Sequence, residues 1–458
     1  MLTITAATYL KTVRRRRLEG ISELEDRVRP ILEDVRRRGD EALAEYTARF
    51  DGPDCVPVRL EVTPEEKAAA WDRADPAVVE ALMAAAERIR DFHSRQVQQS
   101  WTAVQPDGSV VGQLMRPVEA VGIYVPGGTA AYPSSVLMAA IPAQVAGVDQ
   151  VIACTPPGPG GLANPYVVVA ADIAGVDRVF KVGGCQAIAA MAFGTATVPA
   201  VDKIVGPGNA YVTAAKRLVY GYCDIDMLAG PSELAVLADE SADPRLVAAD
   251  MLSQAEHGPD SQAVFITTSA ELADEVSREI QAQARALPRR DIVLAALERH
   301  CLIVLAGSME EAVAVANAYA AEHLEVLTRD PWALLGQLKN AGSVMVGPNS
   351  PVAANDYATG PNHVLPTGGT ARSWSALSVR DFVRVQSVTS LTAEGLEAVA
   401  GLAETIAKVE GLHAHAASVR ARRAGMAGTA GMAGTAWTAR CAPWAQEAEP
   451  PRRGGGAQ

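Results

Sequence analysis

The short segment Ser253–His257, with the sequence SQAEH, carries side chains that can bind a metal ion. It closes a helix-like segment that begins at Pro244. Gln254 and His257 are three residues apart and therefore share one helix face, whereas Glu256 points elsewhere. Two neutral donors on one face can hold an ion such as zinc. The alternative is a polar helix end at which His257 only complements the helix dipole.

A second polar pair, Glu322-His323, stands at the start of an apolar segment that is typical of a strand. Adjacent strand residues point to opposite faces, but at a strand end both side chains can reach one cleft. A histidine can take an alcohol proton near neutral pH, and a carboxylate can activate water. The alternative is a pair of surface residues at a strand start.

Two later segments also concentrate polar side chains. Asp356 and His363 lie in a loop stiffened by Gly and Pro, and Glu410–His415 lies within a helical pattern. The alternatives are a surface Asn/Asp turn and a solvated helix face. Five of the seven histidines of the chain fall in these motif segments. This concentration favours one shared polar site over five unrelated structural histidines.

Three glycine-rich turns each follow a strand-like segment and precede a helical one: Tyr124–Gly128, Gly183–Gln186 and Gly206–Asn209. Glycine allows a ligand to approach the backbone closely, and helix N-termini favour phosphate. Ordinary tight turns are the alternative. Gly158–Ala163 is the nearest approach to a dinucleotide fingerprint, but three prolines crowd it and no acidic ribose partner is well placed. We therefore expect any nucleotide to be held by other residues.

Apolar strand-like segments alternate with helical segments between residues 118 and 220, and again from residue 234 to 346. This alternation is typical of βαβ units with a parallel sheet. The predicted fold class is α/β, with two Rossmann-like βαβ domains whose sheets are rich in parallel strands, an N-terminal helical arm and a small C-terminal helical domain. A cleft between the two α/β domains is the expected ligand site.

The sequence pattern also predicts domain boundaries. They are residues 1–20 for an N-terminal arm, 21–117 together with 233–374 for a discontinuous first α/β domain, 118–232 for a second α/β domain, 375–423 for a helical dimerisation segment, and 424–458 for a disordered tail. The tail includes the unit GMAGTA twice.

Composition limits the classes of function. The chain has 458 residues, 49% hydrophobic and 21% charged, as in soluble globular proteins. A net charge of -12 argues against nucleic acid and anionic membranes as partners. No apolar run approaches the roughly 20 residues that span a bilayer.

The order of residues near the N-terminus bears on location. The basic cluster follows the apolar part, whereas a signal peptide has the opposite order, so we expect a cytoplasmic protein. The six scattered cysteines indicate reduced, buried thiols.

These segments resemble the conserved blocks of the histidinol dehydrogenases. AGPSE at Ala229–Glu233 and SQAEH look like the family's signature. AEHLEV, Asn355–Arg372 and EGLHAH at Glu410–His415 follow in the family's order. The resemblance covers residues 20–422. It implies oxidation of L-histidinol to L-histidine through histidinal, with two NAD, one zinc ion (Zn2+) per subunit and a homodimer.

The resemblance also implies roles for individual residues. The implied zinc ligands are Gln254, His257, Asp356 and His415. The implied catalytic residues are Glu322 and His323. The implied substrate-binding residues are Ser232, Gln254, His257, His323, Asp356, His363, Glu410 and His415. The implied NAD-binding residues are Tyr124, Gln186 and Asn209. Because the family's C-terminal domain reaches into the partner's active site, Glu410 and His415 are expected to act in trans.

The implied chemistry is consistent with these residue types. His323 removes the alcohol proton as hydride passes to NAD, and Glu322 then activates water to hydrate the aldehyde before a second hydride transfer. Glu410 is a suitable counter-charge for the substrate amine. Two features depart from the family pattern: the long repetitive tail, and His413, which adds an imidazole two residues before His415.

Three other functions remain open at this stage. A cysteine-dependent aldehyde dehydrogenase would use Cys154 or Cys185 as nucleophile, although neither has an activating partner in the sequence. A zinc hydrolase would share the His and Asp ligands but need no NAD. A metabolite-binding protein with two α/β lobes would bind without turnover.

Overall fold

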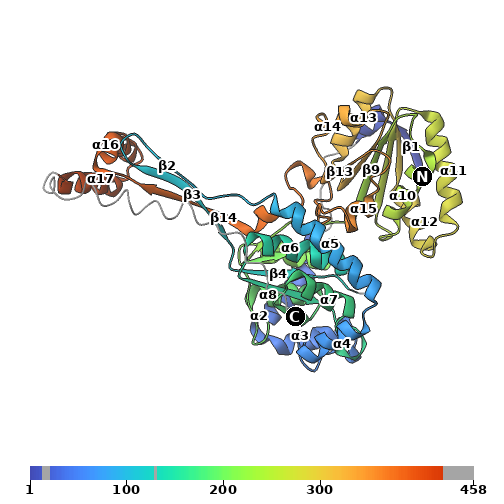
Figure 1. Cartoon of the computed structure of the whole chain (residues 1–458), viewed down its shortest axis with the longest axis horizontal. Coiled ribbons are helices and arrows are strands. Elements are labelled where there is room, and N and C mark those ends of the chain that lie inside the picture. The colour runs from blue at the N-terminus through green and yellow to red at the C-terminus, as the bar shows by residue number, and fades with distance from the viewer. Residues whose placement is uncertain (13–20, 128–130, 427–458) are drawn as a thin grey trace. The chain divides into compact units, whose positions relative to one another are not determined.

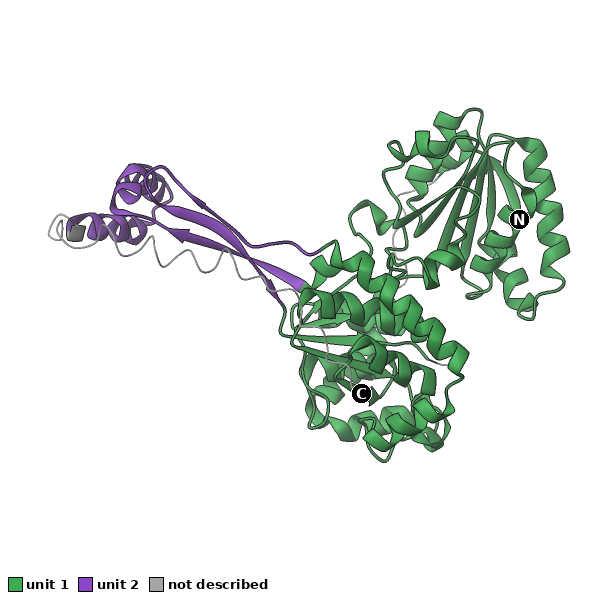
Figure 2. Cartoon of the chain, viewed as in Figure 1, with its two compact units in different colours: residues 1–96, 118–382 green, residues 97–117, 383–458 purple. Residues whose placement is uncertain are grey.

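The computed structural model of the chain describes residues 1–12, 21–127 and 131–426 (Figure 1). Gly128, Cys441 and almost all of the predicted tail lie outside the described residues. The chain forms two compact units (Figure 2). The first contains residues 1–96 and 118–382, and the second contains residues 97–117 and 383–458, described up to residue 426.

A six-stranded parallel sheet forms one half of the first unit. Its strands in spatial order are β1 (Leu2–Thr5), β11 (Leu302–Leu305), β10 (Gln262–Thr267), β9 (Glu233–Ala238), β12 (His323–Leu327) and β13 (Ser343–Val346). All residues of β9 and β12 are buried. Such continuous burial is typical of inner parallel strands with helices on both faces.

Two sets of helices cover this sheet (Figure 1). One apolar cluster involves α10 (Pro244–Ala255), α11 (Ala270–Ala284) and α12 (Arg290–Arg299). The other involves α1 (Ala6–Thr12), α13 (Met309–Tyr319) and α14 (Trp332–Leu335). The short helix α15 (Val352–Tyr357) follows β13. Asp243 caps the N-terminus of α10 by accepting a hydrogen bond from the Arg245 backbone, which fixes where that helix begins.

A five-stranded parallel sheet forms the other half of the first unit. Its strands in spatial order are β6 (Arg178–Lys181), β5 (Gln150–Thr155), β4 (Ala120–Tyr124), β7 (Lys203–Val205) and β8 (Asp224–Ile225). One face packs on α2 (Ile21–Arg38), α3 (Asp40–Phe50), α8 (Gly184–Phe193) and α9 (Ala210–Val219). The other packs on α5 (Pro76–Ser94), α6 (Pro133–Ala146) and α7 (Pro165–Ala174), with α4 (Pro64–Arg73) beside α7. The predicted α/β fold with two parallel sheets is confirmed.

The structure groups the N-terminal half of the chain differently from the predicted boundaries. Helices α2, α3 and α5 pack on the five-stranded sheet and α4 packs on α7 beside it, so none of them belongs to the sheet of residues 233–374. Within the predicted N-terminal arm, β1 pairs in parallel with β11 and therefore belongs to the six-stranded sheet. The apolar stripe of a helix shows that it packs against a sheet but does not show which one, so periodicity could not settle this assignment.

The second unit contains an antiparallel sheet that the sequence analysis missed in part. Its strands are ordered β14 (Val383–Ser390), β3 (Val110–Pro117) and β2 (Trp101–Val104), and two helices follow, α16 (Ala393–Val409) and α17 (His413–Met426). Residues 375–423 were expected to be helical, but β14 pairs with β3 along its whole length. Most of β14 is exposed and polar, so it lacks the apolar signal of a buried strand.

Short 3-10 helices complete the described elements: η1 (Pro53–Cys55), η2 (Pro159–Gly161), η3 (Thr370–Arg372) and η4 (Val379–Phe382). Among the described residues, no helix is both long and apolar enough to cross a membrane.

Candidate active site

His323 lies at the centre of a buried polar cluster where β12 begins beside β9. It is 4% exposed. Its Nε2 lies 3.0 Å from Oδ1 of Asp356, and its Nδ1 lies 3.3 Å from the carbonyl oxygen of Glu233. Both partners are acceptors, so the contacts are satisfied together only when both ring nitrogens carry a proton. The arrangement therefore favours the positively charged imidazolium.

The charges around His323 explain its protonation. Burial alone lowers the pKa of the imidazole, but the carboxylates of Glu322 and Asp356 outweigh that effect and raise the pKa to about 9. Burial acts to raise the pKa of the Asp356 carboxyl, and the hydrogen bond and charge of His323 reverse this, so that its pKa lies below the usual value. His323 and Asp356 thus form a buried ion pair.

Glu322 lies beside this pair and is also buried. Its Oε2 accepts a hydrogen bond of 2.7 Å from the Glu233 backbone N–H and lies 3.8 Å from Nδ1 of His323. Burial raises the pKa of Glu322 to about 8, and the positive charge of His323 offsets only part of that rise. A carboxyl group with a pKa near neutrality is suited to proton transfer.

Helix α10 directs Gln254 toward the interior. The side chain of Gln254 is 1% exposed, and neither of its amide atoms, Oε1 nor Nε2, has a hydrogen-bond partner among the described residues. Buried amides are nearly always paired, so these two atoms are available to a ligand that the chain does not supply. His257, just beyond the end of α10, is exposed and lies close enough to Asp356 and His323 to interact with their charges.

Among the described residues, no group of three or more His, Cys, Asp or Glu side chains is arranged to hold a metal ion. The predicted zinc set contains only three residues of those types, because its fourth member is Gln254. One of the three, His415, belongs to the second unit. Oδ1 of Asp356 is engaged by His323.

The loop after α15 is anchored by residues that the sequence analysis did not select. Nδ1 of His363 donates to the Asp356 carbonyl at 2.8 Å, and its Nε2 lies 3.4 Å from Oγ of Ser135. The neighbouring Asn362 donates to the Met138 carbonyl at 2.6 Å and lies 3.3 Å from Nε2 of His93. His93 is fully buried. It lies in none of the sequence motifs, and only the folded structure shows that it supports the residue beside His363.

Two glutamates complete the surroundings of His323. Glu233, the last residue of the AGPSE motif, is buried, and its Oε1 accepts a hydrogen bond of 3.0 Å from the Gly368 backbone. Glu325, two residues after His323 on β12, is also buried and accepts a hydrogen bond of 2.9 Å from the Val352 backbone at the start of α15. Both were present in quoted motifs, but acidic residues on a strand give no sequence signal of burial.

The remaining predicted substrate residues are Ser232, Glu410 and His415. Ser232 is half-buried directly before β9, and its carbonyl accepts the Gln262 N–H at 3.0 Å. Glu410 and His415 are exposed, Glu410 at the end of α16 and His415 in the first turn of α17. Both belong to the second unit.

The three residues predicted to bind NAD lie in the half of the first unit that contains the five-stranded sheet. Tyr124, at the end of β4, is buried, and its hydroxyl accepts a hydrogen bond of 3.1 Å from the Gly184 backbone at the start of α8. Gln186 is also buried, and its Nε2 lacks a partner within the described part of the chain. Asn209 is exposed and caps α9 by accepting hydrogen bonds from the backbones of Tyr211 and Val212.

A cavity of about 800 Å³ lies at the carboxyl ends of β4 and β5. Its lining includes Pro126 and Gly127 after β4, Thr155 at the end of β5, and Gly158, Leu162 and Ala163 of the turn that was excluded as a dinucleotide fingerprint. The carboxyl ends of parallel strands are the usual nucleotide site in open α/β sheets. That turn therefore lines the expected site even though it lacks the fingerprint.

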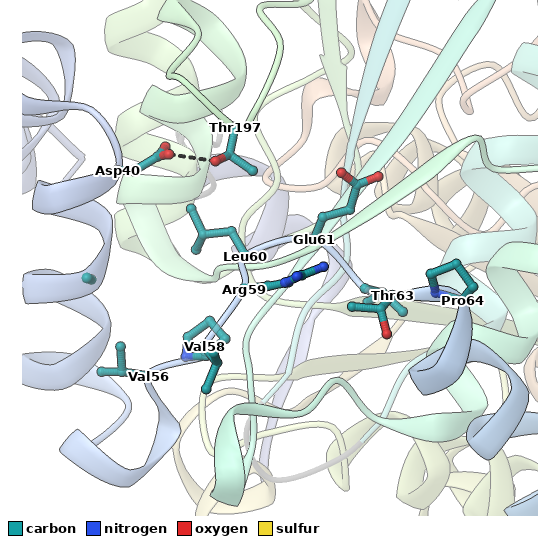
Figure 3. Close-up of a pocket in the computed structure, with 12 residues that line it drawn as sticks. Asp40, Val56, Val58, Arg59, Leu60, Glu61, Thr63, Pro64 and Thr197 are labelled. Atoms are coloured by element: carbon teal, nitrogen blue, oxygen red, sulfur yellow. Dashed lines mark hydrogen bonds between the residues drawn. The ribbon is translucent and has the colours of Figure 1, made fainter.

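Two further cavities lie in the first unit. One, of about 710 Å³, is bordered by α5 and α6 and reaches His257 and Tyr357 beside the polar cluster. The other, of about 650 Å³, is lined by residues 56–64 with Asp40, Ala44 and Thr197, and Figure 3 shows the hydrogen bond from Thr197 to Asp40. No predicted site residue lines this second cavity.

The structure does not favour a cysteine nucleophile. Cys154 and Cys185 are both buried, and burial raises the pKa of Cys185 to about 11 and that of Cys154 further still. The thiolate is the reactive form, and at neutral pH both groups are thiols.

Known proteins resemble the chain over nearly its whole length. A family profile described as histidinol dehydrogenase matches residues 14–423. The histidinol dehydrogenase of Heliobacterium mobile is 52% identical over 395 residues, 86% of this chain and 92% of that protein. The histidinol dehydrogenase of Bacillus subtilis is 49% identical over 404 residues, 88% of this chain and 94% of that protein.

A solved structure agrees with the sequence matches. The crystal structure of histidinol dehydrogenase from Elizabethkingia anophelis matches with a TM-score of 0.88 at 38% identity, covering 93% of this chain and 98% of that chain. The chain therefore belongs to the histidinol dehydrogenase family and is an NAD-dependent oxidoreductase of histidine biosynthesis.

Proposed function

We propose that this enzyme oxidises L-histidinol to L-histidine in two steps, through bound histidinal, with two NAD and one zinc ion per subunit. The buried cluster of His323, Glu322 and Asp356 carries the proposal. It places a histidine and a carboxyl group with raised pKa values in one site, as sequential proton transfers require.

His323 is the proposed base for the alcohol proton. It can accept that proton only as the neutral imidazole, so the reaction needs the form that its neighbouring carboxylates disfavour. Glu322 is proposed to activate the water that hydrates the aldehyde, and it must be ionised to do so. Both requirements predict that turnover rises with pH above neutrality.

The residues present fit a zinc ion. Gln254 offers a buried amide oxygen without a partner, Asp356 a buried carboxylate and His257 an imidazole beside it. We propose these three and His415 of a second subunit as the ligands, all of them N or O donors that zinc accepts. When bound, zinc acts as a Lewis acid that can anchor the imidazole and amine of the substrate.

The proposed substrate contacts surround the same cluster. His363 is held by its Nδ1 on the Asp356 carbonyl, which leaves Nε2 as the acceptor on the other side of the ring. Ser232 lies beside Glu233, whose backbone positions both Glu322 and His323. Glu410 is proposed as the counter-charge for the substrate amine.

The proposed NAD contacts are Tyr124, Gln186 and Asn209. Tyr124 ends β4, and the residues that follow it, Pro126 and Gly127, line the cavity at the carboxyl ends of β4 and β5. The unpartnered Nε2 of Gln186 supports this assignment, because a bound nucleotide can supply the missing acceptor. NAD, when bound there, accepts hydride in each step.

We further propose a homodimer in which Glu410 and His415 act in the active site of the other subunit. Helix α16 carries an exposed apolar stripe, with Leu402, Ile406 and Val409 at 67%, 59% and 85% exposure. A contiguous apolar surface of this kind usually marks a protein interface. The buried free cysteines of the described chain are consistent with the expected cytoplasmic location.

The experiment is to measure NADH formed per L-histidinol consumed, before and after zinc is removed with a chelator. Two NADH per substrate, lost on chelation and restored by zinc, support the proposal. One NADH with released aldehyde contradicts the role of Glu322. No NADH from the zinc-loaded dimer favours the hydrolase or binding-protein functions.

A further inference from the structure

A buried ion pair lies beneath one of the glycine-rich turns of the NAD half. Lys216 on α9 and Asp226 after β8 contact each other directly through Nζ and Oδ1. Their side chains are only 3% and 1% exposed. None of the roles assigned above uses this pair.

Both charges are directed at the backbone of one residue, Gly206. The Gly206 N–H donates to Oδ2 of Asp226 at 2.8 Å, and the Gly206 carbonyl accepts from Nζ of Lys216 at 3.0 Å. Opposite charges therefore hold the N–H and the carbonyl group of a single residue. Charge-assisted hydrogen bonds are stronger and more directional than neutral ones.

Gly206 is also held in a conformation that other residues avoid. Its φ is +111°, and a Cβ at this position would lie 2.3 Å from the carbonyl oxygen of Tyr124. The turn thus lies directly against the end of β4. Three residues later Asn209 caps α9, so the position of Gly206 sets where Asn209 stands relative to Tyr124.

Stability alone does not account for this pair. Removing two charges from water is costly, and an apolar pair of similar volume would often serve as well. The pair instead supplies what an apolar pair lacks: a donor and an acceptor at fixed positions for Gly206.

We propose that Lys216 and Asp226 are positioning residues for NAD, holding the turn Gly206–Asn209 in register with Tyr124. This inference rests on the proposed NAD role of Tyr124 and Asn209. Neither charged residue touches the nucleotide in this account; both act through the backbone of Gly206.

The principal test is the double variant Lys216→Met/Asp226→Leu, which removes both charges and leaves neither unpaired. We expect a folded dimer with unchanged kcat at saturating NAD and an unchanged KM for histidinol. The KM for NAD should rise about tenfold or more, because hydrogen bonds to charged groups hold the turn. An unchanged KM for NAD in the folded variant overturns the proposal.

A matched control is a second ion pair of the same sheet. Lys203 on β7 and Asp224 on β8 also pair, at 2.9 Å, but Lys203 donates to the Asp381 carbonyl rather than to the turn. Lys203→Met/Asp224→Asn should leave the KM for NAD unchanged. An equal rise in both double variants would show a general loss of sheet integrity and contradict the specific role.

A second variant covers the case in which the double variant does not fold. Asp226→Glu keeps both charges but lengthens the acceptor by one methylene, so it should fold and still raise the KM for NAD. Wild-type affinity for NAD in Asp226→Glu contradicts the proposal. The wild-type enzyme tests the premise separately: absence of NAD-dependent turnover of histidinol would remove the proposed function itself.

Discussion

The buried polar groups of two regions, the turn Gly206–Asn209 and the end of helix α10, differ in whether the chain itself supplies their hydrogen-bond partners. Under the NAD turn, Lys216, Asp226 and both polar groups of Gly206 find partners within the chain. At the end of α10, both amide atoms of Gln254 are buried and find none within the described residues. An unpaired buried amide costs free energy of folding. We therefore infer that paired buried groups support the fold, whereas unpaired ones mark a ligand site. Gln186, with its unpartnered Nε2, belongs to the second class even though it lies on the NAD half.

The largest expected effect concerns the centre of the polar cluster. His323→Ala should lower kcat roughly 10²- to 10⁴-fold, the usual contribution of a positioned acid or base. His300→Ala is the control, because His300 lies at the end of α12 and in none of the site motifs. Steady-state rates with histidinol measure the loss. Retention of more than a tenth of wild-type kcat by His323→Ala would contradict the role of base.

Removing one charge of the buried pair Lys216–Asp226 should lower the stability of the fold, whereas replacing the unpaired Gln254 should not. Lys216→Met alone leaves Asp226 buried without its counter-ion and should cost about 3–5 kcal/mol of the free energy of unfolding. Denaturant titration measures the change. A loss below about 1 kcal/mol would mean that the pair is not a scaffold element.

The pH dependence of turnover should reflect the carboxylates around His323. Its pKa is raised to about 9, so the imidazole is charged at neutral pH and the neutral base increases as pH rises. We therefore expect kcat to increase from pH 7 toward pH 9, by up to about tenfold per unit. Glu322→Gln removes one carboxylate, which should lower the pKa of His323 and move the rise to lower pH in the first oxidation step, the one that does not need Glu322. A flat profile in both proteins contradicts the assignment.

The smallest effect is expected at the buried thiols. Cys185→Ala should retain wild-type kcat, because burial raises the pKa of that thiol to about 11 and it is not a thiolate at neutral pH. Cys154→Ala should behave in the same way. Loss of activity in a variant that still folds would restore the cysteine-dependent mechanism.

The sequence predicted the sheets better than it predicted the domains. Apolar runs such as Leu234–Leu237 identify inner parallel strands by themselves, and these predictions are confirmed. Helices α2 to α5 were assigned to the wrong sheet, because an apolar stripe contains no information about its partner. Strand β14 was missed because its polar, exposed residues resemble a loop or helix face.

The site residues that lie in sequence motifs could be predicted, and those outside the motifs could not. Glu322, His323 and Asp356 were selected from the sequence, and the structure brings them together. His93 and Lys216 were not selected, because each acts through a residue that only folding brings near: Asn362 and Gly206. Glu410 and His415 were also selected from motifs, and they lie in the second unit.

The most direct measurement compares the Gln254→Leu variant with the wild-type enzyme for bound zinc and for the metal-free melting temperature. If the buried amide is kept for a ligand, leucine should abolish tight zinc binding and turnover. It should leave the metal-free melting temperature equal or higher, because an unpaired polar group is replaced by an apolar one of similar size. Full zinc content together with a lower melting temperature would show that Gln254 is a structural residue, and would contradict the account.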